Sequence, residues 1–306
     1  MDFLSRRIHL VTGKGGVGRT TVAAALASAA ASHGKRVLLT EIGDPEGGYS
    51  AIGRKFGREH LTPDPVPLGP PGLLGCHVWA TRGHELFAHS VIPAGPLIRA
   101  ALRSKALSKF VTAVPSLYEL GVFFHLLKLL QATRTDGSLE HEVVVADMPA
   151  TGQTLALTSL PEILLDALPD GPIPRYMREG QAFLNDPAKG VAWVVTLPEL
   201  LPVTEALELV EGLRATHVEA AGVILNRFPE DPFEADERKE LGALLAERPM
   251  HGALTFQQIG AARTAEAELR AGADVPVFEL PELADAAPDA PPPELCRQLA
   301  AWMEAE

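Results

Sequence analysis

The sequence predicts an α/β fold: a doubly wound, mostly parallel sheet with a helical insertion. Three observations support this prediction: short apolar runs rich in β-branched residues, helical stretches between them, and a glycine-rich segment joining the first run to the first helix. Continuous rather than alternating apolar runs are typical of strands that are buried on both faces of a parallel sheet. The chain has 306 residues, of which 46% are hydrophobic and 22% charged, so one large core is feasible.

Six apolar runs are the expected strands, and helical stretches alternate with them as in a doubly wound domain. In chain order the runs are residues 7–12, 36–41, 142–147, 191–197, 220–226 and 275–280. The expected helices are residues 20–33, which are rich in alanine, 203–216, 234–247 and 294–305. In the second of these, Val203, Leu207 and Val210 follow helical spacing.

Three regions depart from this alternation. Residues 59–80 contain the Pro/Gly-rich stretch LTPDPVPLGPPGLLG, which predicts a loop. Residues 84–131 are predicted to be a helical insertion subdomain, in which Ser116 and Glu119 fit a capping box. The apolar stretch that follows is either a helix buried against the sheet or part of a groove for an apolar partner. Residues 286–306 predict a Pro-rich linker and a C-terminal helix, all within one domain spanning residues 1–306.

Composition and charge disfavour several classes of partner. Lys and Arg number 27 against 39 Asp and Glu, a formal net charge of −12, which argues against non-specific nucleic-acid binding. No apolar run approaches the roughly 18 residues of a membrane span, and no signal peptide is recognised, so we expect a cytoplasmic protein that is not an integral membrane protein. Cys76 and Cys296 are far apart in sequence, which argues against a Cys-rich metal site within one chain.

The most specific motif is residues 13–21 (GKGGVGRTT), which follow the first strand and open the first helix. Glycines let backbone N–H groups approach an anion, and the helix N-terminus adds a partial positive charge. Gly13 and Gly18 keep the spacing of the phosphate-binding loop G-x-x-x-x-G-K-[ST], and the Thr20 hydroxyl stands where Mg²⁺ is bound. Arg19 replaces the lysine of that pattern.

This loop resembles that of the deviant Walker A family of P-loop ATPases, whose pattern KGGVGKTT includes a signature lysine matching Lys14. Further matches narrow the resemblance to the branch of the arsenite-pump and tail-anchored-protein-targeting ATPases. Residues 43–46 (GDPE) resemble its switch I motif, and residues 147–161 (DMPATGQTLALTSLP) resemble the element after its switch II strand. Residues 225–227 (LNR) resemble its VNQ or VNR segment.

The resemblance implies a dimeric molecular switch that binds and hydrolyses ATP with Mg²⁺ and releases ADP. The implied nucleotide-binding residues are Gly15, Gly16, Val17, Gly18, Arg19, Thr20, Thr21 and Asn226, the last reading the adenine edge. Thr20 would ligate Mg²⁺, and Asp147 would hold the Mg²⁺ shell through water. Asp44 would position the attacking water, and Lys14 would reach the nucleotide of the partner subunit.

Departures from the family pattern leave alternatives open. Arg19 keeps the charge of lysine but has a larger, planar head, and the two are not interchangeable at a crowded phosphate. The chain is therefore either an active ATPase, as a homodimer, or a nucleotide-binding but weak or inactive subunit of a heterodimer with a related ATPase. If residues 84–131 form a groove rather than a buried helix, a protein client or an apolar helix of a partner would bind there. A Rossmann oxidoreductase is disfavoured, because Gly16 and Gly18 supply only part of G-x-G-x-x-G.

Overall fold

The computed structural model describes residues 3–43, 49–91, 117–167, 169–248, 250–283 and 290–304. Its strands are β1 (Ile8–Gly13), β2 (Val37–Gly43), β3 (Val66–Pro67), β4 (Leu73–Trp79), β5 (Val143–Asp147), β6 (Gly190–Thr196), β7 (Ala220–Phe228) and β8 (Val277–Pro281). Its helices are α1 (Arg19–Ser32), α2 (Ala51–Lys55), α3 (Ala80–Val91), α6 (Leu117–Leu130), α7 (Thr151–Ala167), α8 (Pro172–Leu184), α9 (Leu200–Ala215), α10 (Ala235–Glu247), α11 (Ala253–Gly272) and α12 (Pro293–Glu304).

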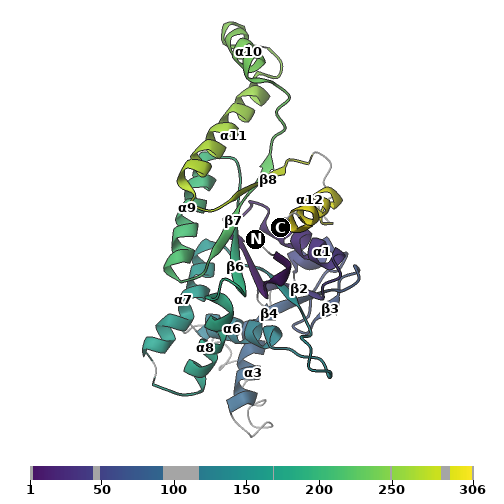
Figure 1. Ribbon diagram of the computed structural model, residues 1–306, viewed down its shortest axis with the longest axis vertical. Helices are drawn as coiled ribbons and strands as arrows, with labels where there is room; N and C mark the ends of the chain where they lie inside the picture. The colour runs from purple at the N-terminus through teal and green to yellow at the C-terminus, as the bar shows by residue number, and fades with distance from the viewer. Residues whose placement is uncertain are drawn as a thin grey trace.

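The strands form one eight-stranded sheet in the order β3-β4-β2-β5-β1-β6-β7-β8. All pairs are parallel except β3 with β4. Helices cover both faces of the sheet (Figure 1). The predicted α/β fold with a doubly wound, mostly parallel sheet is therefore confirmed, and each of the six expected strands is present within about two residues of its predicted bounds.

The prediction of a loop for the Pro/Gly-rich stretch LTPDPVPLGPPGLLG, residues 61–75, is wrong in two places: β3 occupies Val66–Pro67, and β4 begins at Leu73. Strand β4 occupies residues 73–79 and pairs in parallel with β2, from Val37 opposite Leu73 to Gly43 opposite Trp79. Cys76 and Val78 of this strand are buried in the core. The last three residues of that stretch, 73–75, already belong to β4, and the prolines and glycines before them conceal the start of the strand.

Alternate residues of the central strand enter two different cores. Ile8 and Leu10 of β1 pack in the core beneath α6, α7, α8 and α9, whereas Val11 packs in the core beneath α1 and α12. The helix α1 is rich in alanine, and these small side chains allow its backbone to pack close to the backbones of the strands. Leu295 and Leu299 of α12 are buried in the second core, and α12 lies beside α1 (Figure 1).

Helix α6 belongs to the core, as the first alternative for its apolar residues expects. Phe123, Phe124, Leu126 and Leu127 are each at most 3% exposed. Ser116, the expected N-cap, lies outside the described residues, as does most of the stretch between α3 and α6. Among the described residues, no helix is long and apolar enough to span a bilayer.

Helices α3 and α6 cross where both carry glycine. A methyl carbon on Gly83 would overlap the carbonyl oxygen of Gly121, and one on Gly121 would overlap the carbonyl oxygen of Ala80. Glycine at this crossing therefore permits direct contact between the two helix backbones, and any side chain would force them apart.

Gly83→Ala is accordingly expected to lower the free energy of unfolding by about 2 kcal/mol, because overpacking outweighs the gain in helix propensity. Urea-induced unfolding followed by circular dichroism measures this change. Gly260→Ala in α11 is the matched control: nothing lies within 4 Å of the added carbon, so we expect no loss of stability and a gain of up to about 1 kcal/mol. Equal effects of the two substitutions would contradict the close crossing.

A buried histidine, His9, lies near the start of β1. The ring of His9 stacks on Phe3 with centroids 3.6 Å apart, and its Nδ1 accepts a hydrogen bond from Trp193 Nε1 at 3.1 Å. Nε2 must then carry the proton and donate to the Phe3 carbonyl oxygen, 3.0 Å away. Burial of this neutral ring lowers the pKa of His9 to about 3.

This shift makes stability depend on pH in a defined direction. Between the unfolded pKa near 6.5 and the folded pKa near 3, only the unfolded chain binds the proton, so stability falls as pH falls through this window. We expect His9→Gln, which keeps a donor and an acceptor, to reduce the slope of unfolding free energy against pH by about 1.4 kcal/mol per pH unit between pH 4 and 6. Urea unfolding at pH 4, 5 and 6 tests this, and an unchanged slope would show that His9 titrates normally.

Candidate functional site

The glycine-rich loop joins the carboxyl end of β1 to the N-terminus of α1. Gly18 is the N-cap of α1 with φ of 93°, and no side chain caps the helix there. The first-turn N–H groups of α1 are thus left for another acceptor. Added methyl carbons on Gly15 and Gly16 would meet no atom within 4 Å. Open space beside uncapped helix amides suits an anion such as phosphate.

Thr20 and Asp147 meet at the carboxyl end of β5. The Thr20 hydroxyl donates to Asp147 Oδ2 at 2.6 Å. Asp147 Oδ1 is buried, and no described residue donates a hydrogen bond to it. Burial raises the pKa of Asp147 to about 7, against the lowering effects of the Thr20 hydrogen bond and the Arg19 charge. A buried carboxylate oxygen without a donor is the type of ligand that a hard cation or its bound water would satisfy, so these residues fit Mg²⁺.

Arg19 is turned toward the segment that follows β5. Its Nη1 donates to the Met148 carbonyl oxygen at 2.6 Å. A second link joins the same segment to β1: Thr12 Oγ1 donates to Thr154 Oγ1 at 3.0 Å, and Thr154 Oγ1 donates to the Pro149 carbonyl oxygen at 2.9 Å. The guanidinium therefore connects the loop to the backbone just beyond Asp147.

Lys14 lies at the rim of the loop rather than inside it. Its Nζ forms an ion pair with Glu205 Oε1 of α9 at 2.5 Å, and 46% of the Lys14 side chain is exposed. The lysine is thus held by a residue of its own chain in this structure. Asp44 lies outside the described residues, so its position relative to the loop is not assigned.

Asn226 supports the loop from β7. Its Nδ2 donates to the Val17 carbonyl oxygen at 2.8 Å, and the residue is 5% exposed. A cavity of about 380 Å³ opens next to it, lined by Gly18, Thr21, Asn226 and Arg227 on the loop side and by residues 281–283 on the other. Its size and position suit a nucleoside attached to phosphates at the helix N-terminus.

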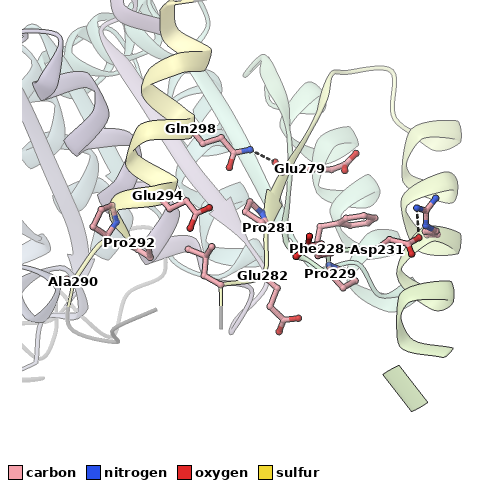
Figure 2. Close-up of a pocket in the computed structure, with 14 residues that line it drawn as sticks. Phe228, Pro229, Asp231, Glu279, Pro281, Glu282, Ala290, Pro292, Glu294 and Gln298 are labelled. Carbon is pink, nitrogen blue, oxygen red and sulfur yellow. Dashed lines mark hydrogen bonds and ion pairs between the residues drawn. The ribbon is translucent and has the colours of Figure 1, made fainter. Parts of the chain in front are cut away.

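A wider groove of about 1080 Å³ continues from this cavity between β7, β8 and α12 (Figure 2). The two share Pro281, Glu282, Leu283 and Pro292. Carboxylates dominate the lining of the groove, with Glu230, Asp231, Glu279, Glu282 and Glu294 against Arg263. Asp231 is paired with Arg238 and Arg263, and Glu279 with Arg270. The remaining carboxylates, Glu230, Glu282 and Glu294, disfavour phosphate in the groove.

Two residues at the site have no counterpart in the sequence-based list. Glu41, two residues before the end of β2, accepts hydrogen bonds from Ser50 Oγ at 2.6 Å and from the backbone N–H groups of Ala51 and Ile52 at 2.9 and 3.1 Å. It therefore anchors the start of α2. Thr154 is the other, through its contact with Thr12. An acidic residue ending a strand signals Glu41 only weakly, and nothing in the sequence pairs Thr12 with Thr154.

The predicted residues converge only in part. Residues 15–21, Asp147 and Asn226 meet at the carboxyl ends of β1, β5 and β7, whereas Lys14 stands at the rim beside α9. Cys76 is buried, and Cys296 is half-buried on α12. Within the described ranges, no group of three His, Cys, Asp or Glu side chains is arranged to hold a metal ion.

Comparison with known proteins gives a consistent set of relatives. The sequence profile of the anion-transporting ATPases matches residues 6–170. The chain is 29% identical to "ATPase BagA" of Mycobacterium tuberculosis and to "Putative ATPase Mb3704" of Mycobacterium bovis, in each case over 91% of this chain and 88% of the relative. It is 28% identical to "ATPase get3" of Botryotinia fuckeliana over 72% of this chain and 60% of that protein.

Proposed function

Because this chain belongs to the anion-transporting ATPase family, we propose that it binds Mg·ATP at residues 13–21 and hydrolyses it to ADP and phosphate. The observation that carries the proposal is the contact of Thr20 with Asp147, whose second oxygen is buried without a donor among the described residues. It lies beside the uncapped N-terminus of α1, where phosphate would bind.

Each residue of the site has a defined task in this proposal. The amides around Gly15, Gly16 and Gly18 hold the phosphates, and the nucleoside occupies the cavity beside Asn226 and Thr21. Thr20 would ligate Mg²⁺ and Asp147 would hold its shell through water; the cation, when bound, neutralises charge on the phosphates. Phosphoryl transfer to water depends mainly on positioning and charge neutralisation, and Asp44 is proposed to orient the water.

We propose further that the protein acts as a dimeric switch, in which Lys14 reaches the nucleotide bound to the partner subunit. Its exposure at the rim of the loop is compatible with such a contact. A protein client is part of the same proposal, but the apolar residues of α6 are occupied in the core. A client with an apolar helix would therefore bind a surface other than α6.

Steady-state Mg·ATP hydrolysis and equilibrium ATP binding by the purified chain test the proposal. Asp44→Asn should keep ATP binding and abolish turnover, because only the attacking water loses its partner. Asp170→Asn, at an exposed ion pair with Arg178, is the control for substituting an aspartate. Unchanged turnover in Asp44→Asn would exclude Asp44 as the water-positioning residue, and failure of the wild type to bind ATP would exclude the function itself.

The contact of Arg19 with the Met148 carbonyl oxygen favours a second candidate function. A guanidinium engaged by the protein is less available to phosphate, so the chain would bind nucleotide but hydrolyse it weakly, as one half of a heterodimer with a lysine-bearing ATPase. Arg19→Lys should then raise turnover at least about tenfold, since lysine matches the crowded phosphate better. Co-purification from the native cell with mass spectrometry would identify the related chain, and recovery of homodimers alone would count against this candidate.

A further inference from the structure

The partner of Lys14 lies on the helix that follows β6. Gly13 at the end of β1 is opposite Val195 of β6 in the parallel register, so the connection from β6 into α9 starts beside the glycine-rich loop. Glu205 lies in the second turn of α9. Its carboxylate therefore stands at the same edge of the sheet as the loop, within direct reach of Lys14.

Glu205 is partly buried, and its negative charge is neutralised mainly by Lys14. The side chain of Glu205 is 30% exposed, and its Oε2 is buried without a donor among the described residues. Oε1 is the oxygen that contacts Lys14. Glu208 and Glu211 of the same helix are exposed and have no ion pair with Lys14 in the described part of the chain, so the contact is specific to one carboxylate.

We propose that Glu205 is a positioning residue that competes with nucleotide phosphate for Lys14, holding this lysine on its own subunit until an ATP-bound partner takes it. The inference rests on the proposed function, because it requires that ATP bound to a second subunit is the alternative ligand of Lys14. A half-exposed ion pair is weak, so Lys14 is able to leave it when a phosphate with greater charge is offered.

Glu205→Gln removes the charge and keeps the size of the side chain, and Glu208→Gln is the matched control on the exposed face. The first measurement is the rate at which acetic acid N-hydroxysuccinimide ester labels Lys14 without nucleotide, with Lys239 as internal reference in the same peptide map. Freeing the amine from its counter-ion should raise the Lys14 rate about threefold in Glu205→Gln and leave it unchanged in Glu208→Gln. An unchanged rate in Glu205→Gln overturns the contact.

The second measurement is the concentration of Mg·ATP at which half of the protein is dimeric, from sedimentation velocity. Removing the competitor should lower this midpoint about threefold in Glu205→Gln, whereas Lys14→Ala should abolish the ATP-dependent dimer. Glu205→Asp, which retains the charge on a shorter side chain, should fall between Glu205→Gln and the wild type.

The outcomes separate this inference from the proposed function. ATP-dependent dimerisation with the same midpoint in Glu205→Gln and the wild type overturns the role of Glu205 alone. A wild type that binds no ATP, or binds it without dimerising, overturns the proposed switch and the competition together. Faster labelling combined with a lower midpoint supports the inference.

Discussion

Asp147→Asn is expected to reduce Mg·ATP turnover by about 100-fold or more, the size of effect seen when a preorganised electrostatic group is removed from a reaction site. Asparagine has nearly the same shape as aspartate, and its amide oxygen can still accept the Thr20 hydrogen bond. It has no negative charge to offer a divalent cation, however, so positioning is preserved while the cation is lost. Single-turnover and steady-state hydrolysis at saturating Mg·ATP measure the loss.

The same substitution is expected to stabilise the Mg²⁺-free protein at alkaline pH. Burial raises the pKa of Asp147 from 3.8 to about 7, so at pH 8 the folded chain holds an ionised carboxylate in an unfavourable site. That penalty develops as pH rises from 3.8 through 7 and is absent below 3.8. In the variant, the gain from removing this charge is partly offset because the buried amide NH₂ has no hydrogen-bond partner. We expect a net gain of about 2 kcal/mol at pH 8 and no gain at pH 4.

Urea unfolding of both proteins in EDTA at pH 4 and pH 8 tests the predicted pH dependence. Asp170→Asn, whose carboxylate is exposed, should show neither the loss of turnover nor the gain in stability. A variant that is inactive and less stable at pH 8 would indicate that Asp147 supports the fold, and the assignment of a cation to its free oxygen would be wrong.

The glycine-rich loop was predictable, because its residues are consecutive in sequence and its chemistry depends on their spacing along the chain. Residues 13–21 follow a buried strand and precede a helix, and that order alone places backbone amides at a helix N-terminus. The fold was predictable for a related reason, since strands buried on both faces are continuous apolar runs. Strand β4 was missed because proline and glycine precede it, and helices α7 and α11 were missed because their apolar periodicity is weak. Helix α8 was missed although its apolar residues follow helical spacing.

The partners that Arg19, Lys14 and Glu41 contact in the folded protein were not predictable. Arg19 meets the Met148 carbonyl oxygen, and Lys14 meets Glu205, across 129 and 191 positions of the chain. Sequence gives the charge of each residue but not which of several acceptors tertiary packing brings within reach. Glu41 shows the same limit: nothing in its sequence position indicates that its carboxylate accepts hydrogen bonds from the first backbone N–H groups of α2.

Gly18→Ala is expected to weaken Mg·ATP binding about 30-fold or more. Gly18 has φ of 93°, a conformation that costs an alanine about 1–2 kcal/mol. The added methyl carbon would also overlap Asn226 Nδ2, which donates to the Val17 carbonyl oxygen. Either the loop keeps its shape and the fold bears this strain, or the loop relaxes and its amides no longer point at the phosphates.

These two responses are distinguishable because the strain must appear in one of two measured quantities. Isothermal titration with Mg·ATP gives the loss of binding free energy, and urea unfolding of the nucleotide-free variant gives the loss of stability. We expect their sum to be about 2–4 kcal/mol, with most of it in binding, because an exposed loop relaxes more readily than a core. Gly15→Ala is the control for the fold: its added carbon meets nothing within 4 Å, so stability should be unchanged. If Gly18→Ala leaves both ATP binding and stability unchanged, the contact with Asn226 does not hold the loop in the shape that binds phosphate.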